Sequence, residues 1–147
     1  MEEYKYIIIP LIAVAICQTL KFLVELFTNH KVSLVRLLDG AGGIPSSHST
    51  VTSCLATLIG VDNGLNSPIF AVSLFLCLVV MYDAMGIRYE TEKQAKVINK
   101  ITEKIKLKNL TGELQDLKEE VGHKPIEVFC GFILGTMIGL IYSFWIK

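Results

Sequence analysis

Four long apolar segments limit the folds open to this 147-residue chain. They cover residues 6–27, 45–61, 68–87 and 126–146. A helix needs about 20 mainly apolar residues to cross the hydrocarbon core of a bilayer, and only the second segment, which opens with the polar turn PSSHST, matches this weakly. Because 52% of the residues are hydrophobic, we predict an all-α integral membrane bundle of about four transmembrane helices, in a single domain over residues 1–147.

A polar insert at residues 88–125 separates the third and fourth segments. Apolar side chains recur in it at helical spacing, at Ala95, Ile98, Ile101 and Ile105. This spacing predicts an amphipathic helix over EKQAKVINKITEKIKL that lies on the membrane or against the bundle. A second short helix is expected from the capping residue Thr111 to Gly122. A solvated face with an apolar stripe explains most of the insert without a ligand.

The basic residues predict how the spans are oriented, because cytoplasmic loops are enriched in Lys and Arg. Lys31 and Arg36 lie between the first two spans, none lies between the second and third, and the insert is rich in lysine. We therefore expect a multi-pass protein of the cell membrane with both termini outside. Three span ends, before 45–61, after 68–87 and before 126–146, would then meet at the cytoplasmic face, unless the second segment is a re-entrant hairpin.

Charge and cysteine usage exclude several classes of protein. Lys plus Arg and Asp plus Glu both number 14, and they are interleaved in the insert, so no nucleic-acid-binding face is expected. All four cysteines lie in apolar runs without C-x-x-C spacing and are predicted to be buried thiols. The acidic start MEEYK is unlike a signal peptide, so the first span is expected to remain in the mature protein.

The second span begins with GGIPSSHS, residues 42–49. Glycines would let the backbone approach a ligand, a proline suits the first helical turn, and the helix start offers unpaired N–H groups to an anion such as phosphate. His48 can carry a proton near neutral pH. The phosphate-binding groups expected here are Gly43, Ser46 and Ser47. A simpler interpretation is a capping serine pair beside an interfacial histidine.

Two further polar clusters flank the insert. In GHKPIEV, His123 and Glu127 are four residues apart, so within a helix Glu127 could bond one imidazole nitrogen and leave the other as a nucleophile. An acid in the first helical turn is also favourable by itself. In YDAMGIR, Arg88 could clamp phosphoryl oxygens, or could anchor the interface while pairing with Asp83. Asp83 is assigned a supporting role.

Together these clusters predict a phosphoryl-transfer site. His123 would attack phosphorus, and His48 would protonate the leaving oxygen. The sequence has no carboxylate pair with metal-ligand spacing, so neither a metal nor another cofactor is expected. Vanadate, which mimics the phosphoryl transition state, would fit the same donors.

At these residues the sequence resembles the type-2 phosphatidic-acid phosphatase superfamily, which includes the vanadium haloperoxidases, and more closely its small divergent membrane branch. The resemblance to that branch covers nearly the whole chain, through GGIPSSHS, YDAMGIR, QAKVIN and GHKPIEVFCG. The superfamily's P-S-G-H motif corresponds to residues 45–48, with Ser47 in place of glycine. The resemblance implies that Ser46 and the backbone of Ser47 contact phosphate and that His48 is the general acid.

The superfamily's S-R-x5-H-x3-D motif corresponds in part to His123 and Glu127, with glutamate in place of aspartate. The resemblance implies that His123 is the nucleophile that becomes phosphorylated and that Glu127 orients it. The Ser-Arg pair is missing, as is the superfamily's K-x6-R-P motif. Arg88 and Lys21 are expected to supply the missing cations from other helices.

The expected function is hydrolysis of a lipid phosphate or diphosphate by a membrane phosphatase through a phosphohistidine intermediate. Two alternatives remain open: a non-catalytic protein that binds or transports lipid phosphates, and a structural membrane subunit whose polar motifs serve helix packing. Small residues at four-residue spacing in the last span, Gly131, Gly135 and Gly139, could also support a homodimer.

Overall fold

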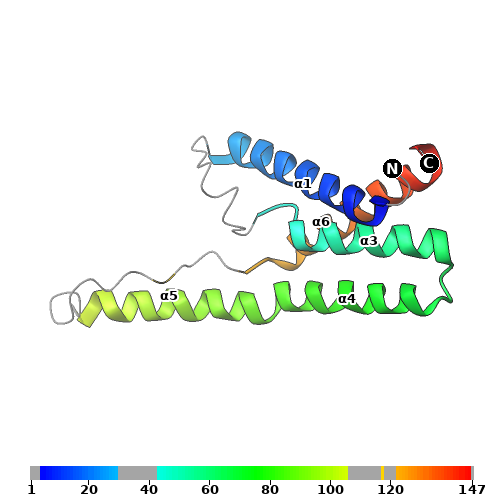
Figure 1. Cartoon of the computed structure of the whole chain (residues 1–147). Helices are drawn as coiled ribbons and strands as arrows, with labels where there is room; N and C mark the ends of the chain where they lie inside the picture. The colour runs from blue at the N-terminus through cyan, green and yellow to red at the C-terminus, as the bar shows by residue number, and fades with distance from the viewer. Residues whose placement is uncertain (1–3, 30–42, 106–116, 118–121, 147) are drawn as a thin grey trace.

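The computed structural model describes residues 4–29, 43–105, 117 and 122–146, and these are helical or connecting segments without a strand. The bundle helices are α1 (Lys5–Asn29), α3 (Ser47–Asn63), α4 (Pro68–Met85) and α6 (Pro125–Ile141). They run alternately in opposite directions, and α6 continues into a π-helical turn, η3 (Tyr142–Ile146) (Figure 1). The predicted all-α bundle is confirmed, and the second apolar segment is a continuous helix rather than a re-entrant hairpin.

Helix α3 lies at the centre of the bundle although it is the least apolar of the four. It packs against α1, α4 and α6. Three helical stretches around it are long and apolar enough to cross a membrane, namely Lys5–Phe27, Pro68–Glu103 and Pro125–Ile146. Its buried hydroxyls bond to carbonyls of its own helix, Thr50 Oγ1 to Ser46 O at 2.8 Å and Ser53 Oγ to Ser49 O at 2.7 Å. The surrounding helices therefore shield a polar core helix from lipid.

The small residues of α6 bring this helix into close contact with α3. A Cβ atom added at Gly135 would lie 2.1 Å from Ser53 Oγ and 2.2 Å from the carbonyl oxygen of Thr50. Gly131 and Gly139 face α3 in the same way, and Thr50 Oγ1 donates a hydrogen bond to Gly131 O at 3.1 Å. The glycine face from which the sequence suggested a homodimer is therefore occupied by α3 of the same chain.

The amphipathic helix of the insert is α5 (Ile87–Ile105), which continues the direction of α4 beyond the end of the bundle (Figure 1). Backbone hydrogen bonds run through the junction at Gly86, from Gly86 N to Tyr82 O at 2.8 Å and from Glu90 N to Gly86 O at 3.0 Å. The helix is confirmed, but it extends α4 instead of packing against the bundle, because the junction keeps its helical bonding.

Several sequence-based expectations lie outside the described residues. They are the short helix from Thr111, the basic loop residues Lys31 and Arg36, and Gly42. Leu117 lies beside α5, where its backbone N–H and C=O both bond to the side-chain amide of Asn99, at 3.0 and 2.9 Å.

Candidate functional site

The amino ends of α3 and α6 and the carboxyl end of α4 meet at one end of the bundle. Two backbone hydrogen bonds join them: Ser46 N donates to Glu127 O at 2.9 Å, and His123 N donates to Ala84 O at 3.1 Å. The alternating directions of the helices bring these ends together (Figure 1). The predicted meeting of the three polar motifs is therefore confirmed.

Two histidines face each other at this end. The rings of His48, in the first turn of α3, and His123, just before α6, are 5.9 Å apart between centroids and nearly perpendicular, at 83°. Three of their nitrogens, His48 Nδ1 and both ring nitrogens of His123, are buried without a hydrogen-bond partner in the part of the chain that the structure describes. A buried polar group without a partner costs about 1–3 kcal/mol. The arrangement is therefore suited to a ligand that supplies hydrogen-bonding groups.

The environment of His123 favours a neutral imidazole. Its side chain is 1% exposed, and burial is the main reason why the pKa of His123 is lowered to about 4. The positive charges of Lys21 and Arg88 and the neighbouring His48 lower it further, whereas Glu92 opposes them. At neutral pH the ring therefore carries a lone pair that can attack an electrophile.

Glu127 does not bond to His123 as the sequence suggested. Helix α6 begins at Pro125 with Lys124 as its N-cap, so His123 lies before the helix and does not share a helical face with Glu127. Glu127 Oε2 instead accepts hydrogen bonds from Lys124 N at 3.0 Å and from Gly43 N at 3.4 Å. Its carboxylate caps α6 and holds the turn before α3. The expected hydrogen bond that would orient His123 is absent.

Ser46 has a structural role at the start of α3. It is the N-cap of α3 and fully buried. Its Oγ accepts from Ser49 N at 3.5 Å and from Ser49 Oγ at 3.2 Å. The capping serine of the simpler interpretation is therefore present at Ser46, and its contact with phosphate stays a prediction. Ser47 and His48 follow it as the first helical residues, and their N–H groups have no partner within α3.

Gly43 and Lys21 come together on the α1 side of the site. Gly43 has a φ of 137°, a conformation open to glycine and strained for other residues. A Cβ atom there would lie 3.4 Å from Lys21 Cδ, and the Lys21 side chain is largely buried. Since the charge of Lys21 acts on His48 and His123, α1 brings this cation to the site, as expected.

Arg88 pairs with Asp83 across the junction of α4 and α5. Arg88 Nε lies 2.6 Å from Asp83 Oδ2, and both side chains are partly exposed. The pairing that the sequence left open is thus present, and it uses the inner nitrogen of the guanidinium group. Because the positive charge of Arg88 also acts on both histidines, Asp83 can hold Arg88 while its terminal nitrogens face an anion.

Sequence reasoning missed the support that α5 gives to His123. Glu92 Oε2 accepts a hydrogen bond from Gly122 N at 3.2 Å, and a Cβ atom at Gly122 would lie 2.5 Å from Tyr89 Cα. Glu92 occurs in a run of charged residues in the predicted amphipathic helix, and nothing in that run distinguishes it.

No group of three His, Cys, Asp or Glu side chains that could hold a metal occurs among the described residues.

Comparison with known proteins identifies the family of this chain. Residues 3–138 match the Divergent PAP2 family. The chain is also 33% identical to YuiD of Bacillus subtilis (strain 168), described as an uncharacterized membrane protein, over 92% of this chain and 91% of the relative. No solved structure matches the chain. The chain therefore belongs to the Divergent PAP2 family and is a membrane protein.

Proposed function

We propose that the protein is a membrane phosphatase that releases phosphate from a lipid phosphate or diphosphate without a metal or other cofactor. The observation that carries the proposal is the pair of facing histidines, three of whose buried ring nitrogens have no hydrogen-bond partner among the described residues. The positive charges of Arg88 and Lys21 act on both rings. A phosphoryl group bound there would supply acceptor oxygens and a negative charge. Membership of the Divergent PAP2 family supports the same chemistry.

The reaction follows from the positions of the two rings. A neutral nitrogen of His123 forms a bond to phosphorus while the bond from phosphorus to the lipid oxygen breaks. His48, protonated when the anionic phosphoryl group is bound, gives its proton to that oxygen. Arg88, Lys21 and the N–H groups at the start of α3 hold the charge on the other phosphoryl oxygens. Neutral His48 then takes a proton from water, which attacks the phosphohistidine, breaks its N–P bond and releases phosphate. Vanadate would bind the same groups as an inhibitor.

We place the site at the cytoplasmic face of the cell membrane. The lysine-containing helix α5 extends from the bundle at the end where the histidines lie (Figure 1). Basic residues next to membrane spans favour the cytoplasmic side. This position would give the enzyme access to headgroups of the inner leaflet.

One alternative has an observation in its favour. Ser46 and Glu127, which the resemblance assigned to phosphate binding and catalysis, both serve as helix caps. A protein that binds or transports lipid phosphates without turnover would keep the cations and have no need of these catalytic contacts. It would lose function in cells with Arg88→Ala and keep it with His123→Ala, whereas the enzyme would lose function with both.

Phosphate release tests the proposed function directly. Purified protein in detergent or liposomes is assayed with a panel of lipid monophosphates and diphosphates, beside His123→Ala and the control Phe129→Ala, which changes an exposed residue of α6. The proposal predicts release by the wild type and by Phe129→Ala, and loss with His123→Ala. A folded wild-type protein that releases no phosphate from any substrate would contradict it.

A further inference from the structure

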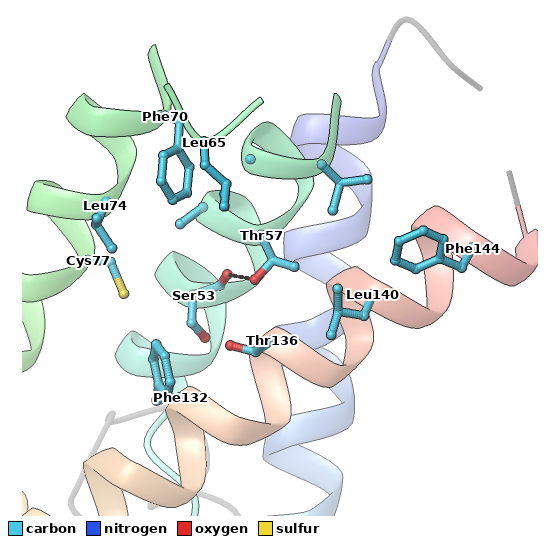
Figure 2. A pocket seen from close by; sticks show the side chains of 13 residues that line it. Ser53, Thr57, Leu65, Phe70, Leu74, Cys77, Phe132, Thr136, Leu140 and Phe144 are labelled. Carbon is cyan, nitrogen blue, oxygen red and sulfur yellow. Dashed lines mark hydrogen bonds between the residues drawn. The ribbon is translucent and has the colours of Figure 1, made fainter. Parts of the chain in front are cut away.

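An apolar groove opens between α4 and α6, with α3 as its floor. It has a volume of about 560 Å³, within the range of about 300–1,000 Å³ typical of small-molecule sites. Figure 2 shows Phe70 and Leu74 of α4 on one side and Phe132 and Leu140 of α6 on the other. The hydroxyls of Ser53 and Thr57 bond to carbonyls of α3, at 2.7 and 2.8 Å. The groove therefore presents an apolar surface.

The histidines lie beyond one end of the groove, where α3 begins and α4 ends. His123 N bonds to Ala84 O and so joins the chain before α6 to the end of α4. On the floor, Ser53 marks the near end of the groove and lies five residues after His48, about 7–8 Å along the helix axis. The far end is lined by Leu65 and Phe144. A chain attached to a phosphate between the histidines therefore has to cover about 7–8 Å to reach the near end of the groove.

We propose that this groove binds one hydrocarbon chain of the phosphate-bearing lipid, with the chain running from the histidines toward Leu65 and Phe144. This inference rests on the proposed function for the headgroup and adds the class of substrate: a lipid whose recognition depends on a single long apolar chain. Each methylene removed from water contributes about 0.8 kcal/mol. The groove thereby favours long-chain phosphates over short, water-soluble phosphate esters.

Filling the groove from one wall tests this assignment. In Thr136→Trp, an indole enters the groove from α6. In the matched control Ile133→Trp, the same side chain is placed on an exposed position of α6 that does not line the groove. We expect Thr136→Trp to lower kcat/KM for a long-chain phosphate about tenfold or more and to leave kcat/KM for a short-chain ester nearly unchanged. Leu74→Trp, from the opposite wall, should do the same. Equal loss for both substrates, or equal loss in the control, would overturn the assignment.

A second measurement does not depend on turnover. An alkyl phosphate with a photoreactive diazirine near the end of its chain is cross-linked to the wild type and to both α6 variants, and the labelled residues are mapped by mass spectrometry. Labelling of residues that line the groove, reduced by Thr136→Trp and retained in Ile133→Trp, supports the inference even if no phosphate is released, in which case only the proposed reaction fails. Labelling spread evenly over the exposed faces of α1, α4 and α6 would overturn it, even if the protein is an active phosphatase.

Discussion

His48 and His123 lie edge to face with ring centroids 5.9 Å apart, yet neither ring bonds to the other. The backbone holds them in place: Ser46 N bonds to Glu127 O next to one ring, and His123 N bonds to Ala84 O at the other. The two rings are therefore positioned before a ligand arrives. Such preorganisation is what a site that stabilises developing charge requires.

The first prediction concerns the protonation of His123. Because burial lowers its pKa to about 4 from an ordinary value near 6.5, the ring stays neutral as the pH falls from 7 to 5 and gains a proton only near pH 4. An NMR titration of ¹⁵N-histidine-labelled protein, assigned with His123→Ala, should show this. Bound inorganic phosphate should raise the pKa, and Glu92→Gln should lower it. A His123 signal that titrates near pH 6.5 without ligand would contradict the buried position of the ring.

The second prediction separates capping from catalysis at Glu127. Glutamine can also serve in a capping box, so Glu127→Gln should keep nearly wild-type stability and kcat. Glu127→Ala should lower the free energy of unfolding by about 0.5–2 kcal/mol, the usual cost of a lost helix cap. Thermal unfolding in detergent and steady-state kinetics measure both effects. If Glu127→Gln loses activity by orders of magnitude at unchanged stability, the carboxylate takes part in the chemistry after all.

The third prediction concerns the Arg88–Asp83 pair. Arg88→Lys keeps the charge but loses the guanidinium fork, so kcat/KM for a lipid phosphate should fall by about 10²-fold, as for the loss of a donor to developing charge. Asp83→Asn should have a smaller effect, because it loosens Arg88 without removing it. Inhibition by vanadate should weaken in the same order. A larger effect from Asp83→Asn than from Arg88→Lys would mean that Asp83 has more than a supporting role.

The fourth prediction tests the contact between α6 and α3. Gly135→Ala would place a methyl group 2.2 Å from the Thr50 carbonyl oxygen, where the backbone must shift, whereas Gly139→Ala meets mainly the Thr57 side chain at 2.9 Å. Overpacking of this kind costs about 1–3 kcal/mol, so Gly135→Ala should lower the thermal midpoint more than Gly139→Ala. Neither change should alter the extent of chemical cross-linking between copies of the protein. Equal, negligible shifts would contradict the close packing of these helices.

The fold was largely predictable from hydrophobic segment lengths. These identified α1, α4 and α6 and placed three polar helix ends together, because successive crossings of a membrane run in opposite directions. The same pattern could not show which helix lies at the centre. The polar first turn made 45–61 the weakest span, whereas the structure shows that the polar side chains of α3 bond to its own carbonyls while three other helices cover it.

The site was predictable by residue type and less so by contact. His48, His123 and Arg88 come together as expected, because their motifs lie at helix ends that meet at one end of the bundle, and Lys21 of α1 lies close enough to act on both histidines. The role of Glu127 depended on where α6 begins, and a helix boundary is uncertain by a residue or two from sequence alone. A start at Pro125 instead of His123 turns the carboxylate toward Lys124 N. Contacts between distant residues, such as Glu92 with Gly122, leave no local pattern in a sequence.

The central claim is that His123 accepts the phosphoryl group of a lipid substrate. Its most direct test is to mix the wild type with a lipid phosphate that it hydrolyses, quench the reaction rapidly under alkaline conditions that preserve phosphohistidine, and locate the covalent phosphate by mass spectrometry. We predict a phosphoryl group on His123 in the wild type and none in His123→Ala. Phosphate release without any phosphorylated His123, or release that persists in His123→Ala, would contradict the account.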